Sequence, residues 1–272
     1  MSRFLSAITC KKRLVTSVTM AEHGSAASVA EPGRFAVNPV AIIGGMGPEA
    51  GVDMTARFLK ACRAELGRTG TEISDQSYPP HVLIQYRVPD RTAAFRGVGD
   101  SPLPALVAAL GTARAAGARL CGIACNTAHL WHAEMAALFP ELTLIHIARE
   151  TAAAAKQRGA RTVAVLATTA THESGLYRDA LASAGLRFVE RPAREIEAVH
   201  DAIFRIKSGE LDAATPHIEM AVAAALRDAD CVVLGCTELG LVIKPDAYAG
   251  GAVIDAAQVL AARLAQQALC CQ

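Results

Sequence analysis

The sequence has few aromatic residues, a single tryptophan, and no apolar run of the roughly 18 residues that a membrane span requires. Its formal net charge of +1 gives no support to a nucleic-acid or membrane-surface partner. It also lacks a phosphate-binding loop, the glycine spacing of a dinucleotide site, and any lysine in a recognisable pyridoxal phosphate context.

The cysteines are numerous, but their positions argue against disulfide bonds. Of the eight, Cys121, Cys125, Cys231 and Cys236 lie in or beside expected core strands. A chain of 272 residues buries a sizeable core without such crosslinks, so we expect reduced thiols in a cytoplasmic enzyme. We expect no metal site, because the Cys-x3-Cys and Cys-x4-Cys spacings along strands differ from a zinc knuckle.

The N-terminal residues 1–38 differ in composition from the rest. They carry four basic residues before the first acid, Glu22, together with many Ser, Thr and Ala residues. This composition is typical of a transit peptide, and a disordered extension or a true start at Met20 also explains it. Because the segment shows no clear periodicity, we expect a flexible N-terminal extension.

Apolar runs alternate with helical patterns and divide the remaining chain into two α/β halves. Each half opens with a strand that leads into a loop of small residues, at 44–47 and 167–171. Strands are expected at 39–43, 81–86, 119–124, 142–147, 161–166, 186–190, 230–235 and 252–254. Helices are expected at 48–66, 102–117, 126–138, 149–158, 172–184, 193–207, 212–227 and 256–269. The sequence therefore predicts a two-part α/β fold with parallel sheets.

Two of the expected strands end in a cysteine that is followed at once by polar residues. Cys125 precedes Asn126 and Thr127, and Cys236 precedes Thr237 and Glu238. Open α/β sheets bind ligands at the carboxyl ends of their strands, and helix N-termini favour anions there, including thiolates. We therefore expect one site with a thiol on either side.

Five motifs, in order from about residue 40 to 240, resemble those of the aspartate racemase branch of the Asp/Glu racemase family of cofactor-independent amino acid racemases. They are Gly-Gly-Met-Gly-Pro at 44–48, Pro-Asp-Arg-Thr at 89–92, Cys-Asn-Thr-Ala-His at 125–129, Ala-Thr-Thr at 167–169 and Gly-Cys-Thr-Glu at 235–238. The resemblance implies two Rossmann-like domains with pseudo-twofold symmetry, an active site in the cleft between them, no cofactor and a homodimer. It also implies that 39–148 plus 245–272 form the first domain and 149–244 the second.

The sequence departs from the family pattern at three places. Ala170 stands where the family usually has glycine, and the N-terminal extension has no counterpart. Glu238 follows Cys236-Thr237, whereas glutamate racemases usually carry histidine there, which favours the aspartate branch.

The expected chemistry is removal of the α-proton of an amino acid on one face and its return on the other. Two groups of similar proton affinity on opposite faces perform this directly, so we interpret Cys125 and Cys236 as a thiolate and thiol pair. A cysteine at a strand end is otherwise a small core residue. His129 either lowers the pKa of the Cys125 thiol or is a packed histidine, and Glu238 polarises the Cys236 thiol, binds the substrate ammonium or caps a helix.

Further residues are expected to bind the substrate. Arg91 and Lys207 resemble the basic residues that bind the side-chain carboxylate, since guanidinium matches a carboxylate in a two-pronged geometry. Hydroxyl, amide and backbone N–H groups at the strand ends are expected to stabilise the α-carboxylate, although each also fits a helix cap. The substrate-binding set is Met46, Arg91, Asn126, Thr127, Thr168, Thr169, Lys207, Thr237 and Glu238.

Four other functions fit parts of this pattern. Maleate isomerases and arylmalonate decarboxylases share the two-domain design, but a decarboxylase is expected to keep one cysteine of the pair. A racemase of broad specificity needs a different pocket around Arg91. A non-catalytic protein that binds an anion needs neither thiol.

Overall fold

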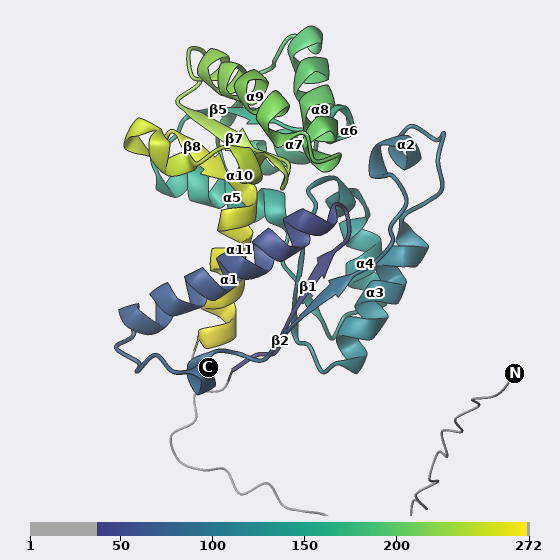
Figure 1. The fold of residues 1–272 in the computed structure, drawn as a ribbon, viewed down its shortest axis with the longest axis vertical. Coiled ribbons are helices and arrows are strands. Elements are labelled where there is room, and N and C mark those ends of the chain that lie inside the picture. Colours follow the sequence, from purple (N-terminus) through teal and green to yellow (C-terminus); the bar gives the residue numbers. More distant parts are fainter. Residues whose placement is uncertain (1–36, 271–272) are drawn as a thin grey trace, which may run out of the picture. The chain divides into compact units, whose positions relative to one another are not determined.

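The computed structural model describes residues 37–270, and within them eight strands form two parallel sheets of four strands each (Figure 1). The first sheet has the order β2-β1-β3-β4 and the second the order β6-β5-β7-β8. The first contains β1 (Val40–Gly44), β2 (His81–Gln85), β3 (Leu120–Ile123) and β4 (Thr143–Leu144). The second contains β5 (Thr162–Leu166), β6 (Arg187–Phe188), β7 (Cys231–Leu234) and β8 (Val253–Asp255). The predicted α/β fold with two similar halves is confirmed.

Helices connect the strands in both halves. The α-helices are α1 (Pro48–Arg68), α2 (Arg91–Phe95), α3 (Leu103–Ala115), α4 (His132–Leu138), α5 (Ile147–Gln157), α6 (Thr169–Glu173), α7 (Leu176–Ser183), α8 (Ala193–Lys207), α9 (Leu211–Ala225), α10 (Leu239–Val242) and α11 (Ala256–Leu269). Short 3-10 helices are η1 (Asp75–Ser77), η2 (Thr127–Trp131), η3 (Pro245–Ala247) and η4 (Ala249–Gly251). We call β1–β4 with α1–α4 the first lobe, and β5–β8 with α5–α10 the second lobe.

Alternation along the central strands buries both faces of each sheet. Val40 and Ile42 of β1 pack toward α1 and α11, whereas Ala41 and Ile43 pack toward α3 and α4. Successive strand residues point to opposite faces, so a strand covered on both sides is apolar throughout. In the second lobe the same alternation along β5 and β7 divides the core between α5 with α7 and α8 with α9. This packing fixes where the carboxyl end of each strand lies.

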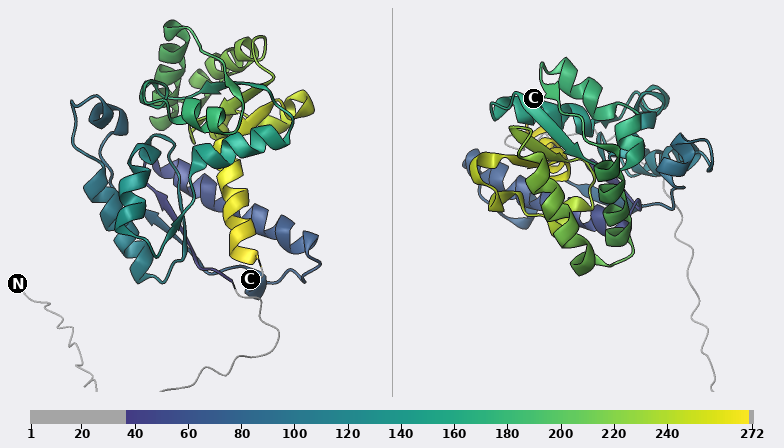
Figure 2. Two further views of the ribbon diagram at one scale, coloured as in Figure 1. Left: turned by 180° about the vertical axis from the view of Figure 1, so that it is seen from behind. Right: turned by 90° about the horizontal axis from the view of Figure 1, so that it is seen from above.

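The core beside α11 is continuous between the two lobes. It joins residues of α1 and β1 with residues of α5, α7, β5 and β7. Helix α11, drawn in yellow in Figures 1 and 2, packs along α1 and also contacts α5. All described residues accordingly belong to one compact unit.

The structure differs from the sequence-based prediction at several elements. Strand β8 pairs with β7 in the second sheet, whereas 245–272 were assigned to the first domain. Helix α11, which follows β8 directly, packs on α1 and β3, so the chain passes from the second lobe to the first within a few residues. The helix expected at 172–184 is two helices, separated at Gly175, whose φ of 75° is left-handed. The helix expected at 126–138 begins as the 3-10 helix η2 before α4.

Several predictions concern residues outside the described part. The flexible extension predicted for 1–38 falls there except for its last two residues, and so do Cys10 and Cys271. Within residues 37–270, no helix is long and apolar enough to cross a bilayer.

Candidate functional site

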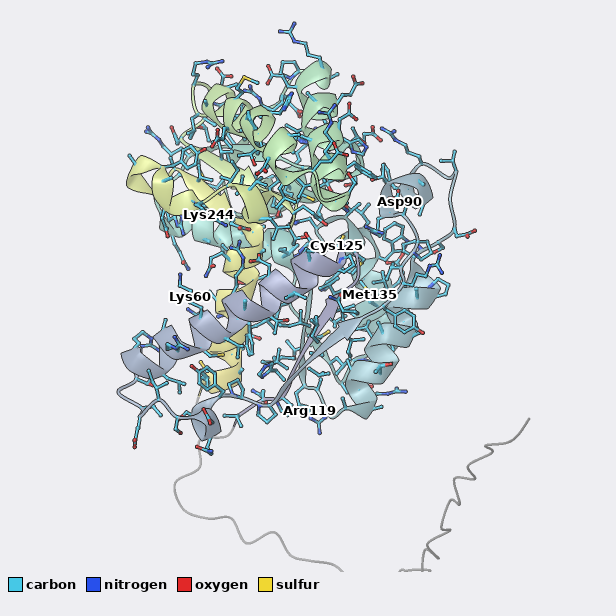
Figure 3. The ribbon with its side chains drawn as sticks, viewed as in Figure 1. Lys60, Asp90, Arg119, Cys125, Met135 and Lys244 are labelled. Carbon is cyan, nitrogen blue, oxygen red and sulfur yellow. The ribbon has the colours of Figure 1, made fainter. Side chains whose placement is uncertain are left out.

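Cys125 and Cys236 occupy equivalent places in the two lobes, just beyond the carboxyl ends of β3 and β7 (Figure 3 labels Cys125). Each of these strands is an inner strand, and their neighbours β1 and β5 end in the loops at Met46 and Thr168. Both cysteines are 6% exposed. The matched topology explains why two similar sequence motifs supply the two thiols.

The Cys236 thiol donates a hydrogen bond to a carboxylate. Its Sγ donates to Oε2 of Glu238 over 3.0 Å, and the Thr237 hydroxyl lies 3.2 Å from the same oxygen. The other oxygen, Oε1, accepts from the backbone N–H of Gly47 at 2.9 Å and is 3.5 Å from Nζ of Lys207. Glu238 makes no side-chain capping bond to α10, so it contacts the thiol rather than capping the helix.

These contacts determine the charge state of the pair. Burial works to raise the pKa of Glu238, but Lys207, the Cys236 thiol and the Gly47 N–H together hold it below its ordinary value. Burial and then the Glu238 charge raise the pKa of Cys236 well above its ordinary value, against the opposing effect of Lys207. A smaller increase comes from Cys125, so the two thiols are close enough to interact. Cys236 is therefore a thiol beside a carboxylate at neutral pH.

Cys125 interacts with Arg91, whereas Lys207 interacts with both thiols. Arg91 is the first residue of α2, whose N-cap is Asp90. Burial works to lower the pKa of Arg91, but Cys125, then Asp90 and Glu238, outweigh it and raise that pKa. The pKa of Lys207 is likewise raised, by Glu238 and both cysteines against burial. Both cations thus lie within electrostatic reach of the Cys125 thiol.

Arg91 and Lys207 converge on one backbone oxygen. Nη2 of Arg91 and Nζ of Lys207 donate to the carbonyl of Met46, at 2.9 and 3.1 Å. The Met46 side chain is buried in the core of the first lobe, so this residue presents its carbonyl to the site rather than its side chain. The two basic residues predicted from the resemblance, far apart in sequence, are therefore brought together.

Two buried donors near Cys125 have no hydrogen-bond partner within residues 37–270. They are Nε of Arg91 and Nδ2 of Asn126, on side chains that are almost fully buried. An unsatisfied buried donor costs about 1–3 kcal/mol. Buried polar groups are nearly always bonded in proteins, so these two N–H groups are candidates to bind a ligand.

The predicted threonines form a different network from the one expected. The hydroxyls of Thr127, Thr168 and Thr171 lie 3.0–3.1 Å from one another and join the two lobes. Thr169 instead lies near His200, 3.5 Å from its Nδ1. The structure thus brings Thr127 and Thr168 into direct contact and adds a third hydroxyl, that of Thr171, which sequence reasoning missed.

Two hydrogen bonds from the second lobe hold the chain on either side of Cys125. The Thr237 hydroxyl lies 3.2 Å from the carbonyl of Ala124, and the Tyr177 hydroxyl donates to Oδ1 of Asn126 at 2.5 Å. Sequence reasoning missed Tyr177 because a tyrosine among the apolar residues of a helix is interpreted as a core residue. A buried tyrosine hydroxyl usually has a hydrogen-bond partner, so a tyrosine in an apolar helix pattern was a signal that such a partner exists.

Burial keeps Cys121, Cys231 and His129 in their neutral forms. Burial raises the pKa of Cys121 to about 12 and, as the main cause, that of Cys231 to about 11, as expected for the predicted core cysteines. His129 contacts the Cys125 carbonyl through Nδ1 at 2.9 Å, and burial lowers its pKa to about 4. A neutral, packed histidine agrees better with these contacts than a charged one. No group of three or more His, Cys, Asp or Glu side chains in the described chain is arranged to hold a metal ion.

Similarity to known proteins agrees with this geometry. A family model described as Asp/Glu/Hydantoin racemase matches residues 43–264. The structure is similar to an aspartate racemase of Picrophilus torridus, with a TM-score of 0.72 and 29% identity over 85% of this chain and 94% of that one. An aspartate racemase homologue from Pyrococcus horikoshii has a TM-score of 0.56 and 24% identity, covering 85% of this chain and 99% of that one.

A glutamate racemase isoform from Bacillus anthracis shares the fold, with a TM-score of 0.57 at 18% identity, covering 86% of this chain and 82% of that one. The family match spans both lobes and both cysteine motifs. The chain therefore belongs to the Asp/Glu/Hydantoin racemase family, a family of isomerases.

Proposed function

We propose that the protein is a pyridoxal phosphate-independent racemase that interconverts L- and D-aspartate with Cys125 and Cys236 as the two acid/base groups. The observation that carries the proposal is the opposite charge beside two matched thiols. Cys236 donates to the Glu238 carboxylate, whereas Cys125 interacts with the Arg91 guanidinium. A carboxylate favours the thiol form of its neighbour and cations favour the thiolate form.

The reaction then begins with Cys125 as the base. Its thiolate removes the α-proton of one enantiomer, and the Cys236 thiol returns a proton to the opposite face of Cα. Cys125 is left as a thiol and Cys236 as a thiolate, so the other enantiomer reacts by the reverse path. General acid/base steps of this kind contribute about 10²–10⁴-fold in rate.

The carbanion formed in between requires stabilisation, and donors beside Cys125 are available for it. As the proton leaves Cα, negative charge accumulates on the α-carboxylate. We assign Nδ2 of Asn126 as the donor to the α-carboxylate, because it is buried and lacks a partner in the described structure. Fixed donors directed at developing charge are among the largest contributions to catalysis. Backbone N–H groups beside Thr127, Thr168, Thr169 and Thr237 complete this binding set.

Aspartate is proposed as the substrate because the site offers two cations for a second carboxylate. Arg91 and Lys207 share the neutral carbonyl of Met46, and a carboxylate accepts more strongly from charged donors than a neutral carbonyl does. Glu238 in place of the histidine usual in glutamate racemases supports the same choice. The aspartate racemase of Picrophilus torridus, at 29% identity, is consistent with it. The expected homodimer and cytoplasmic location stay predictions.

The test is α-proton exchange in deuterated buffer without added cofactor. Each enantiomer of aspartate is followed by NMR with the wild type, Cys125→Ala and Cys236→Ala. Three results together support the two-thiol racemase. The wild type exchanges the α-proton with inversion, and each single variant loses inversion. A double variant exchanges the α-proton of neither enantiomer. Exchange with another amino acid only would retain the mechanism and change the substrate. No exchange across a full amino acid panel would overturn the racemase and favour a maleate-type isomerase or an anion-binding protein.

A further inference from the structure

Tyr177 in α7 contacts both of the loops that carry the cysteines. Its side chain is buried, with 2% exposure. The ring lies against Gly235, the residue before Cys236, since a Cβ placed on Gly235 would be 3.1 Å from Cε2 of Tyr177. The hydroxyl donates at 2.5 Å to Oδ1 of Asn126, the residue after Cys125. One side chain thus connects the two acid/base loops across the lobes.

The hydrogen bond from Tyr177 determines which way the Asn126 amide points. Burial raises the pKa of the Tyr177 hydroxyl above its usual value, so the group stays protonated and serves as a donor. The amide atom that faces it in the structure is the acceptor Oδ1. Nδ2 is left as a buried donor without a partner in the described residues. The orientation of the amide therefore follows from a residue in the other lobe.

We propose that Tyr177 is a positioning residue that holds the Asn126 amide so that Nδ2 donates to the α-carboxylate of the bound amino acid. This inference rests on the proposed function. Because the carboxylate gains negative charge as the α-proton leaves, the bond from Nδ2 strengthens toward the transition state. Loss of the Tyr177 hydroxyl should accordingly lower kcat more than it raises KM.

The absence of a side chain at Gly235 leaves room for the Tyr177 ring. A side chain there would meet Val165 and Ala167 as well as the tyrosine ring. The ring therefore fills space that the backbone before Cys236 leaves open, and phenylalanine would fill it equally well. Only the hydroxyl is needed for the amide contact, so removing the hydroxyl alone distinguishes positioning from packing.

The kinetic test compares Tyr177→Phe, Asn126→Ala and the double variant, with Tyr248→Phe as the matched control. Tyr248 is a half-buried tyrosine of the second lobe outside the site. We expect kcat to fall about 10–100-fold in Tyr177→Phe and about 100-fold or more in Asn126→Ala. The double variant should be no slower than Asn126→Ala, because both changes remove the same interaction. A Tyr177→Phe enzyme within twofold of wild type, or losses that multiply in the double variant, would overturn the inference.

Asn126→Asp tests the donor while keeping an acceptor for Tyr177, so it does not depend on how well Tyr177→Phe folds. It replaces Nδ2 by an oxygen and should reduce kcat at least as much as Asn126→Ala. Wild-type kcat in Asn126→Asp would contradict the assignment of Nδ2 as a donor.

A readout independent of activity separates this inference from the proposed function. In protein labelled with ¹⁵N-asparagine, the side-chain NH₂ signals of Asn126 are identified by their loss in Asn126→Ala. Tyr177→Phe should shift this pair and Tyr248→Phe should not. An unchanged pair would overturn the contact. An inactive wild type would instead overturn the proposed function and the role toward substrate, while a shift would still support the orientation of the amide.

Discussion

The loops after β3 and β7 hold cysteines in the same topological position but with partners of opposite charge. Cys236 is bonded to Glu238, two residues further along its own loop. Cys125 is followed by the neutral Asn126, and its charged neighbour Arg91 comes from another element, α2. The repeated fold supplies matched positions, and the charged residues around them differ. A symmetric scaffold thus carries an asymmetric pair of thiols.

The largest expected effect comes from removing either member of the pair. In Cys125→Ala and Cys236→Ala, inversion of aspartate should fall by about 10³-fold or more, because one face of Cα has no proton carrier. Each variant should still exchange the α-proton of one enantiomer, and the two variants should act on opposite enantiomers. Separate NMR measurement of each enantiomer checks this. Exchange of the same enantiomer by both variants would contradict the placement of the thiols on opposite faces.

The next effect comes from removing the charge that distinguishes the two loops. In Glu238→Gln the carboxylate that raises the pKa of Cys236 is gone while Lys207 still lowers it, so this pKa should fall. Because a smaller fraction of Cys236 is then in the thiol form, kcat should fall about 10–100-fold. The thiolate absorbance of Cys236, followed against pH in a Cys125→Ala background, checks the pKa directly. Glu190→Gln is the control, since Glu190 pairs with Arg178 at the surface.

An unchanged titration of Cys236 in Glu238→Gln would show that the bond to the carboxylate does not govern this thiol. The asymmetry between the two loops would then need another source. Lys207→Met offers the opposite change, because it removes a charge that lowers the pKa of Cys236.

Short-range sequence patterns predicted the strands and the two cysteines, because apolar runs of four to six residues report burial directly. The partners of the site residues were less accessible. Arg91 and Lys207 meet at the Met46 carbonyl, a contact that depends on how three distant segments fold. The role of Tyr177 was hidden for the same reason, since its partner Asn126 belongs to the other lobe. Strand β8 pairs with β7, whereas the boundary at residue 245, taken from the family resemblance, placed it in the first domain.

A smaller effect, on stability rather than activity, concerns His129, which is buried, and His146 and His172, which are partly buried. Burial, the largest cause in each, lowers the pKa of His129 and His172 to about 4 and that of His146 to about 3. In the unfolded chain these groups take up protons below about pH 6.5, whereas the folded protein binds them only near pH 4 or below. The free energy of unfolding is therefore fully retained above pH 6.5 and is lost as the pH falls below it, by about 1.4 kcal/mol per histidine for each pH unit.

Urea unfolding checks this dependence, followed by the fluorescence of Trp131, the single tryptophan of the sequence. Between about pH 7 and about pH 5.5, three such histidines should reduce the free energy of unfolding by about 4 kcal/mol. His146→Asn keeps an N-cap for α5 and should remove about a third of the loss. A pH dependence equal to wild type in this variant would show that His146 does not contribute.

A contact inside the site should affect stability less. Thr171→Val removes one hydroxyl from the buried network with Thr127 and Thr168, which joins the lobes. Because the two remaining hydroxyls still bond to each other, we expect a loss of about 1–2 kcal/mol in the free energy of unfolding. Urea unfolding at neutral pH measures it, and Thr112→Val is a control, since its hydroxyl bonds within an exposed face of α3. Equal losses of the free energy of unfolding in both variants would show that the buried network contributes no more to stability than an exposed hydroxyl does.

The smallest effect is expected from the exposed ion pair that joins the same two lobes. Arg96, which follows α2, lies 2.6 Å from Glu173 in α6, but each side chain is 46% exposed. Water screens such a pair, so Arg96→Gln should change the free energy of unfolding by less than about 1 kcal/mol, and less still at high salt. Urea unfolding at two salt concentrations, beside Thr171→Val, measures the difference. A loss larger than that of Thr171→Val would mean that the surface pair, and not the buried hydroxyls, is the stronger link between the lobes.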